Sequence, residues 1–120
     1  MSAPRTATVR TTDHGDVTVT CPAWCLGAHD QDGYRADIAH DGPEHPFTYR
    51  GETVGSVLIT QAPYAETTTR LAHGHVDLVI GGTSLDPAGL DELAAALVDY
   101  AVAVRRAARE LAVILAGGGQ

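Results

Sequence analysis

Two cysteines and two histidines stand within 20 residues of one another, with the spacing Cys-x3-Cys-x3-His-x10-His. Two thiolates and two imidazoles make a complete tetrahedral ligand set for zinc, and thiolates favour zinc over magnesium or calcium. Residues 22–46 are rich in Gly, Pro and Asp and show no strand or helix periodicity. Because loops of this length are uncommon in a compact domain, a metal ion is the expected source of order. We predict a zinc site held by Cys21, Cys25, His29 and His40.

The ligand spacing also constrains the path of the backbone. On one straight helix, Cys21 and His29 would lie about 12 Å apart, too far for ligand bonds of about 2.0–2.3 Å to a single ion. The chain must therefore curl, and Pro22 and Gly27 favour such a turn. The single tryptophan, Trp24, is expected to pack over the turn and shield the thiolates from water. Alternatives to His40 as the fourth ligand are His45, Asp41 and His14.

Short segments rich in Thr and Val predict a mainly antiparallel sheet. Residues 6–11 and 16–21 flank turn-forming residues at 13–15, which is typical of a hairpin. In the second strand, Val17, Val19 and Cys21 share one face, so the Cys21 side chain is expected to point toward the core. The further strands expected from the sequence are 47–50, 54–60, 67–73 and 75–80, with the last two forming a second hairpin around Gly74 and with Gly81 and Gly82 ending the sheet.

The C-terminal part of the chain predicts one long helix over residues 86–115. Asp86 is a favourable N-cap, and Pro87 suits the first helical position. Gly117–Gly119 are expected to end the helix. The predicted apolar stripe has helical spacing and consists of Leu90, Leu93, Leu97, Ala101, Val104, Ala108, Leu111 and Leu115.

Together these elements predict one α+β domain over residues 1–120. It comprises a hairpin plus a Cys/His metal loop at 5–46, a mainly antiparallel sheet at 47–82 and the long C-terminal helix at 86–115. With 120 residues, 44% of them hydrophobic, the chain is long enough to bury a core. The zinc ion is expected to pin the N-terminal hairpin and loop into a lobe.

The cysteine-rich stretch resembles an uncharacterised family of small actinobacterial proteins that carry a Cys-Pro-x-Trp-Cys signature followed by two histidines. The similarity runs roughly from Val17 to Ala108, and the Ser84–Leu97 segment is similar to the family's C-terminal helix. The resemblance implies no activity. It implies that one unit is formed by Cys21, Pro22, Trp24, Cys25, His29 and His40.

The net charge and the hydropathy of the chain argue against two classes of partner, nucleic acids and membranes. The chain carries 15 acidic and 8 basic residues, for a net charge of −7, so it lacks the basic footprint that nucleic acids require. No segment has the run of about 18 apolar residues that a membrane span needs. Residues 1–10 are polar and lack the apolar region of a secretory leader. We therefore expect a cytoplasmic protein with no membrane partner and no nucleic-acid partner.

The favoured function is a non-enzymatic binding module with a structural zinc ion and a protein partner. The alternative is a small zinc-dependent hydrolase, with an open coordination position and Asp41 or Glu44 as general base. No catalytic residue is assigned under the favoured reading. Because a 30-residue helix would outrun a compact sheet, a homodimer is expected through the apolar residues near the helix end, which are Val104, Ala108, Leu111, Val113, Ile114 and Leu115.

Overall fold

The computed structural model describes residues 5–79 and 82–117. In chain order the elements are β1 (Arg5–Thr11), β2 (Gly15–Cys21), the 3-10 turn η1 (Arg35–Asp37), β3 (His40–Asp41), β4 (His45–Tyr49), β5 (Glu52–Gln61), β6 (His73–Leu78) and α1 (Pro87–Leu115). Antiparallel sheets and one long C-terminal helix confirm the predicted α+β fold. Ile80, Gly81 and the glycines at 118–119 lie outside the described residues.

The first sheet is the predicted N-terminal hairpin. β1 and β2 pair antiparallel along their whole length, from Arg5 opposite Cys21 to Thr11 opposite Gly15. Gly15 adopts a φ of +61° at the turn, a conformation that glycine enters without steric cost. Val9, Val19 and Cys21 are buried together, as the alternation along β2 predicts.

The second sheet is built around β5, its longest strand. β6 pairs with residues 55–60 of β5, β4 pairs with residues 52–57, and β3 pairs with residues 60–61. A strand residue can pair with one strand on each of its two sides. One part of β5 pairs with both β6 and β3, and another part with both β6 and β4. β3 and β4 must therefore both lie on the side of β5 away from β6, one after the other along the strand. β6 therefore forms the other edge of the sheet.

The predicted second hairpin around Gly74 is wrong. Gly74 lies inside β6, where it pairs with Ile59 of β5, and residues 67–72 form no strand. The backbone of residues 73–78 pairs with β5 along its length, so Gly74 needs no turn conformation. Residues 62–72 instead form an irregular connection anchored by buried Ala65 and Ala72.

Helix α1 begins where the sequence predicts, but it buries a different face. The Asp86 carboxylate accepts a hydrogen bond from the Gly89 amide at 2.8 Å, which satisfies one free N–H of the first turn. Its buried or half-buried residues are Gly89, Leu93, Ala96, Tyr100, Ala103, Val104, Ala107, Leu111 and Ile114. Of the predicted stripe, the exposed residues are Leu90, Leu97, Ala101, Ala108 and Leu115. The face of α1 that packs on the sheet is therefore rotated about the helix axis relative to the predicted stripe. Tyr100 and small residues on this face let the helix approach the sheet closely.

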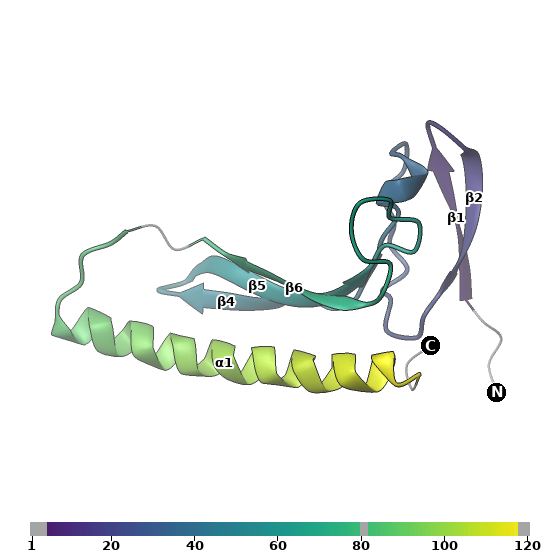
Figure 1. Cartoon of the computed structure of the whole chain (residues 1–120). Helices are drawn as coiled ribbons and strands as arrows, with labels where there is room; N and C mark the ends of the chain where they lie inside the picture. Colours follow the sequence, from purple (N-terminus) through teal and green to yellow (C-terminus); the bar gives the residue numbers. More distant parts are fainter. Residues whose placement is uncertain (1–4, 80–81, 118–120) are drawn as a thin grey trace.

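The core of the sheet and helix depends on two aromatic rings. Phe47 of β4 and Tyr100 of α1 stack with centroids 4.7 Å apart, and the Tyr100 hydroxyl donates to the Ser56 carbonyl at 2.8 Å. Figure 1 shows α1 running along one face of β4, β5 and β6, with the β1–β2 hairpin standing at the end of this layer where α1 finishes. The molecule thus has two lobes, the hairpin with residues 22–39 and the sheet with the helix.

Within residues 5–79 and 82–117, no helix combines the length and the apolar character that crossing a membrane requires.

Candidate metal centre

Four side chains predicted as metal ligands meet where the two lobes join. One ligand atom from each of Cys21, Cys25, His29 and His40 lies within 4.8 Å of all the others. The His29 Nε2 is 3.4 Å from the Cys21 Sγ and 4.0 Å from the Cys25 Sγ. Tetrahedral zinc with ordinary bond lengths holds its sulfur and nitrogen ligands about 3.5 Å apart. The spacing of these atoms therefore fits a tetrahedral ion, and both cysteines are free thiols.

A tight turn brings the two thiols together. Cys21 ends β2, and the Cys25 amide donates to the Pro22 carbonyl at 3.0 Å. The Gly27 amide then donates to the Cys25 Sγ at 3.3 Å, with a Gly27 φ of +83°. The predicted curl is present, and Gly27 supplies the backbone conformation that it needs.

The two histidines offer their nitrogens in different ways. The His29 Nδ1 is 2.9 Å from the Ala39 carbonyl oxygen, and this contact leaves Nε2 directed at the thiols. Such a backbone partner on the second ring nitrogen is typical of metal-binding histidines. His40 is buried, and its Nδ1 has no hydrogen-bond partner among the described residues. A buried polar atom without a partner is costly, and coordination of a cation is one way to remove that cost.

Burial shifts the pKa values of two of these groups toward their neutral forms. Burial, reinforced by the neighbouring Cys25, raises the pKa of the Cys21 thiol. Burial, followed by the charge of His29, lowers the pKa of His40. A neutral imidazole is the form that binds metal, whereas a thiol must lose its proton. The positive charge of a bound divalent ion would compensate a Cys21 thiolate.

Arg5 supports the turn, a role that the Cys/His pattern of the sequence does not indicate. Its guanidinium donates to the backbone carbonyls of Pro22, at 3.0 Å, and of Cys25. Arg5 stands directly opposite Cys21 in the hairpin register. The predicted hairpin register could have indicated this contact, because residues that stand opposite each other on antiparallel strands point to the same face.

Trp24 connects the turn to the other lobe. Its ring packs with the cluster formed by Ile59 of β5, Ala72 and Ile114 of α1, next to half-buried Leu111. Its Nε1 is buried without a hydrogen-bond partner among the described residues. A cavity of about 20 Å³ beside the ring, bordered also by His45, has room for about one water molecule. Shielding of the thiolates by Trp24 stays a prediction.

The three residues considered as alternatives to His40 for the fourth ligand lie outside the Cys/His cluster. His14 contacts Asp13 at 2.9 Å near the hairpin turn. Asp41 accepts a hydrogen bond from the Thr60 hydroxyl at 2.6 Å, and His45 belongs to β4. Within the part of the chain that the structure describes, the Cys21–His40 group is the one cluster of three or more His, Cys, Asp or Glu side chains with metal-site geometry.

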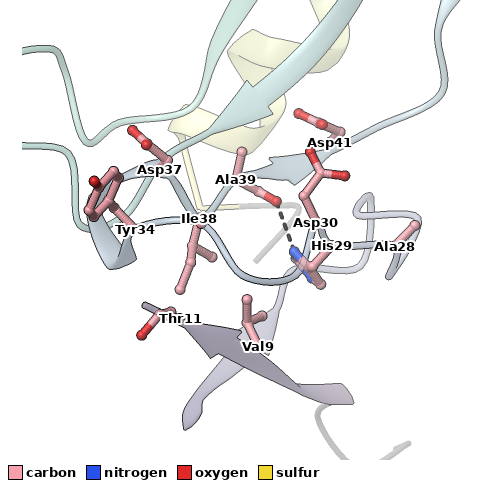
Figure 2. A pocket seen from close by; sticks show the side chains of 11 residues that line it. Val9, Thr11, Ala28, His29, Asp30, Tyr34, Asp37, Ile38, Ala39 and Asp41 are labelled. Carbon is pink, nitrogen blue, oxygen red and sulfur yellow. Dashed lines mark hydrogen bonds between the residues drawn. The ribbon is translucent and has the colours of Figure 1, made fainter. Parts of the chain in front are cut away.

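A cavity of about 290 Å³ lies next to the cluster (Figure 2). His29 forms part of its wall, and Val9 and Ile38 supply apolar surface. Asp30 and Asp41 line the same cavity, whereas Glu44, the other general base considered above, does not. Among the four cluster residues, only His29 reaches this space, so the cavity adjoins the cluster without opening onto the thiols.

Comparison with known proteins identifies a family. The sequence model of a domain family of unknown function, DUF6907, matches residues 6–113. The matched region spans both lobes and contains all four Cys and His residues of the cluster. No curated protein and no solved structure gives a match.

Proposed function

The chain belongs to DUF6907, a domain family of unknown function, and we propose that it is a small zinc-binding module whose ion is structural. In this proposal the ion clamps the hairpin lobe to the sheet and helix, so that the assembled surface can bind a protein partner. The module is non-enzymatic and cytoplasmic. A reducing cytoplasm keeps cysteine pairs available as thiolate ligands.

The observation that carries the proposal is the complete and enclosed ligand set. Cys21, Cys25 and His40 are each at most 7% exposed. With His29 they offer four ligand atoms, which is the number that a closed structural zinc site uses. A catalytic zinc ion usually keeps three protein ligands and an open position for water, so a fourth protein ligand favours the structural role.

The positions of the four ligands in the fold support the proposal that the ion holds the two lobes together. Cys21 ends β2 in one sheet, and His40 begins β3 in the other. Cys25 and His29 lie in the segment between the two sheets. An ion bound to all four would hold the irregular stretch at residues 22–39 against the hairpin and would join that lobe to the sheet with the helix. Binding energy at such a site contributes directly to folding.

Zinc is the favoured ion because of the donor atoms. Two thiolates and two imidazoles suit zinc, and hard oxygen-seeking cations such as magnesium bind such sets poorly. A four-thiolate iron–sulfur cluster needs more cysteines than this chain's two.

The cavity beside His29 supports the second candidate, a zinc-dependent hydrolase. It would place a substrate next to one ligand, with Asp41 in the wall as a general base. That chemistry requires His40 or another ligand to leave the ion, so that water can bind in its place.

Cobalt substitution distinguishes the two candidates. Co²⁺ added to the metal-free full-length protein should give the intense visible absorption of a tetrahedral thiolate site. Excess azide or imidazole should leave that spectrum unchanged, because a closed set has no free position. A spectrum that changes on addition of these ligands would favour the hydrolase, and the absence of a tetrahedral spectrum would contradict both candidates.

A further inference from the structure

One side of helix α1 carries large apolar residues that the sheet does not cover. At about 100° per residue, Leu90, Leu97 and Leu115 lie about 60–80° around the axis from buried Tyr100. Leu90 is 56% exposed and Leu97 is 43% exposed. Ala94, Ala101 and Ala108 repeat at heptad spacing along the same side and are also exposed. We call this side, with Val98 at its margin, the apolar flank.

The two flanks of α1 differ in character. Glu92, on the opposite flank, pairs with Arg50 at the β4–β5 turn, at 3.0 Å, and Glu110 lies near His45 of β4. The polar flank therefore faces β4, and the apolar flank faces β6.

The strand on that side is exposed as well. Val76 and Leu78 of β6 stand opposite Val57 and Gly55 in the register, and they therefore share the helix-covered face of the sheet. Val76 is nevertheless 49% exposed and Leu78 is 56% exposed. The apolar flank and β6 thus both carry exposed apolar side chains, on the side of the sheet along which α1 runs in Figure 1.

The middle of the helix is apolar on nearly all sides. Between Leu93 and Val104 the only charged residue is Asp99, and Val98 and Val102 are more than half exposed. A helix that is apolar all round is typically enclosed by protein.

The charged residues near the apolar flank indicate which molecule covers it. Asp91 stands before the apolar middle, and Arg105 and Arg109 stand after it. Two copies of α1 packed antiparallel about Val98 would bring Asp91 of each copy opposite Arg105 of the other. The same register places Ala94 and Ala101 at the crossing, where small side chains allow close approach. The surface is thus complementary to itself, as a two-fold interface requires.

We propose that a second copy of this chain covers the apolar flank from Leu90 to Ala108, with the two α1 helices packed antiparallel across a two-fold axis near Val98. The interface lies closer to the middle of the helix than the sequence predicts, because Ile114 is buried and Leu111 is half-buried against the sheet side. The proposal does not depend on the metal site, because none of its residues belongs to the Cys/His cluster.

Light scattering and sedimentation equilibrium on the full-length protein test the proposal. Wild type should be a dimer at micromolar concentration. Asp91→Arg and Arg105→Glu should each raise the dimer dissociation constant by about tenfold or more, because each places like charges together. The double variant, which exchanges the two charges, should recover most of the loss.

Arg106→Glu is the matched control, since Arg106 is exposed on the other side of α1. It changes the net charge as Arg105→Glu does and should leave the dimer intact. Circular dichroism checks that each variant keeps its helix. A wild type that stays monomeric at 100 µM would overturn the proposal, and so would a dimer that neither Asp91→Arg nor Arg105→Glu weakens. Either result would leave this face to a different protein or to none.

Discussion

Cys21 ends a strand of the N-terminal hairpin and His40 begins a strand of the second sheet, yet their ligand atoms lie within 4.8 Å of each other. The cluster therefore stands at the junction of the lobes, where a bound ion would hold both.

Loss of one thiolate should unfold the hairpin lobe and spare the aromatic core. We expect Cys25→Ser to lower the free energy of unfolding by about 4 kcal/mol or more, as loss of a metal site does. His73→Ala, a histidine outside the cluster, should change it by less than about 1 kcal/mol. Hydrogen exchange should show β1 and β2 losing protection while the region around Phe47 and Tyr100 stays protected. Equal melting temperatures for Cys25→Ser and wild type would argue against a structural ion.

Removal of the Arg5 side chain should weaken metal binding without removing a ligand. Arg5→Ala deletes the donors to the Pro22 and Cys25 carbonyls, and we expect about 10- to 100-fold weaker zinc affinity, as other supporting residues cause. Arg10→Ala is the control, because Arg10 lies on the same strand and pairs with Asp32 instead. Competition with a fluorescent zinc chelator measures both variants. Indistinguishable affinities would show that Arg5 does not support the turn.

Acid should destabilise the fold and release the metal. Burial, followed by the charge of His29, lowers the pKa of His40 from 6.5. As pH falls below about 6.5, the unfolded imidazole binds a proton that the folded one resists, so the free energy of unfolding decreases toward the lower folded-state pKa. Protons also compete with zinc for the ligands. Melting temperature and bound zinc should both fall between about pH 7 and pH 5; values that stay constant over this range would contradict the prediction.

Gly55 should tolerate no side chain, whereas Gly74 should. A Cβ at Gly55 would collide with the Asp77 carbonyl oxygen and approach the Leu78 side chain to 3.1 Å, but a Cβ at Gly74 would meet nothing within 4 Å. Gly55→Ala should therefore cost about 1–3 kcal/mol. Gly74→Ala should be neutral or slightly stabilising, since it reduces the freedom of the unfolded chain. Urea denaturation compares the two, and equal effects would mean that β5 and β6 pair less closely than the structure indicates.

The sequence predicts the parts of this molecule that depend on local chemistry. The hairpin at residues 5–21 follows from alternation and a turn, and the Asp86 cap marks the start of the helix. The cluster was predictable because Cys21, Cys25 and His29 are close in sequence and because their spacing forces a curl.

The remaining features depend on pairings between distant residues. Gly74 is typical of a turn, yet it sits in a strand because β5 is available to pair with it. The apolar stripe of α1 did not predict the buried face, since Tyr100 is held by Phe47 and Ser56, which are remote in sequence. Trp24 was expected at the thiolates, and its packing against Ile59 and Ile114 is fixed by how the two lobes meet.

The most direct test of the metal centre is elemental analysis of the protein purified under reducing conditions without chelator. We expect about one zinc ion per chain, as a single four-ligand site requires, and little or none in Cys21→Ser and His40→Ala. His75→Ala, which removes an exposed histidine of β6, should retain the full amount. Wild-type protein that contains no zinc and takes none up when zinc is added would contradict a zinc site at the Cys/His cluster.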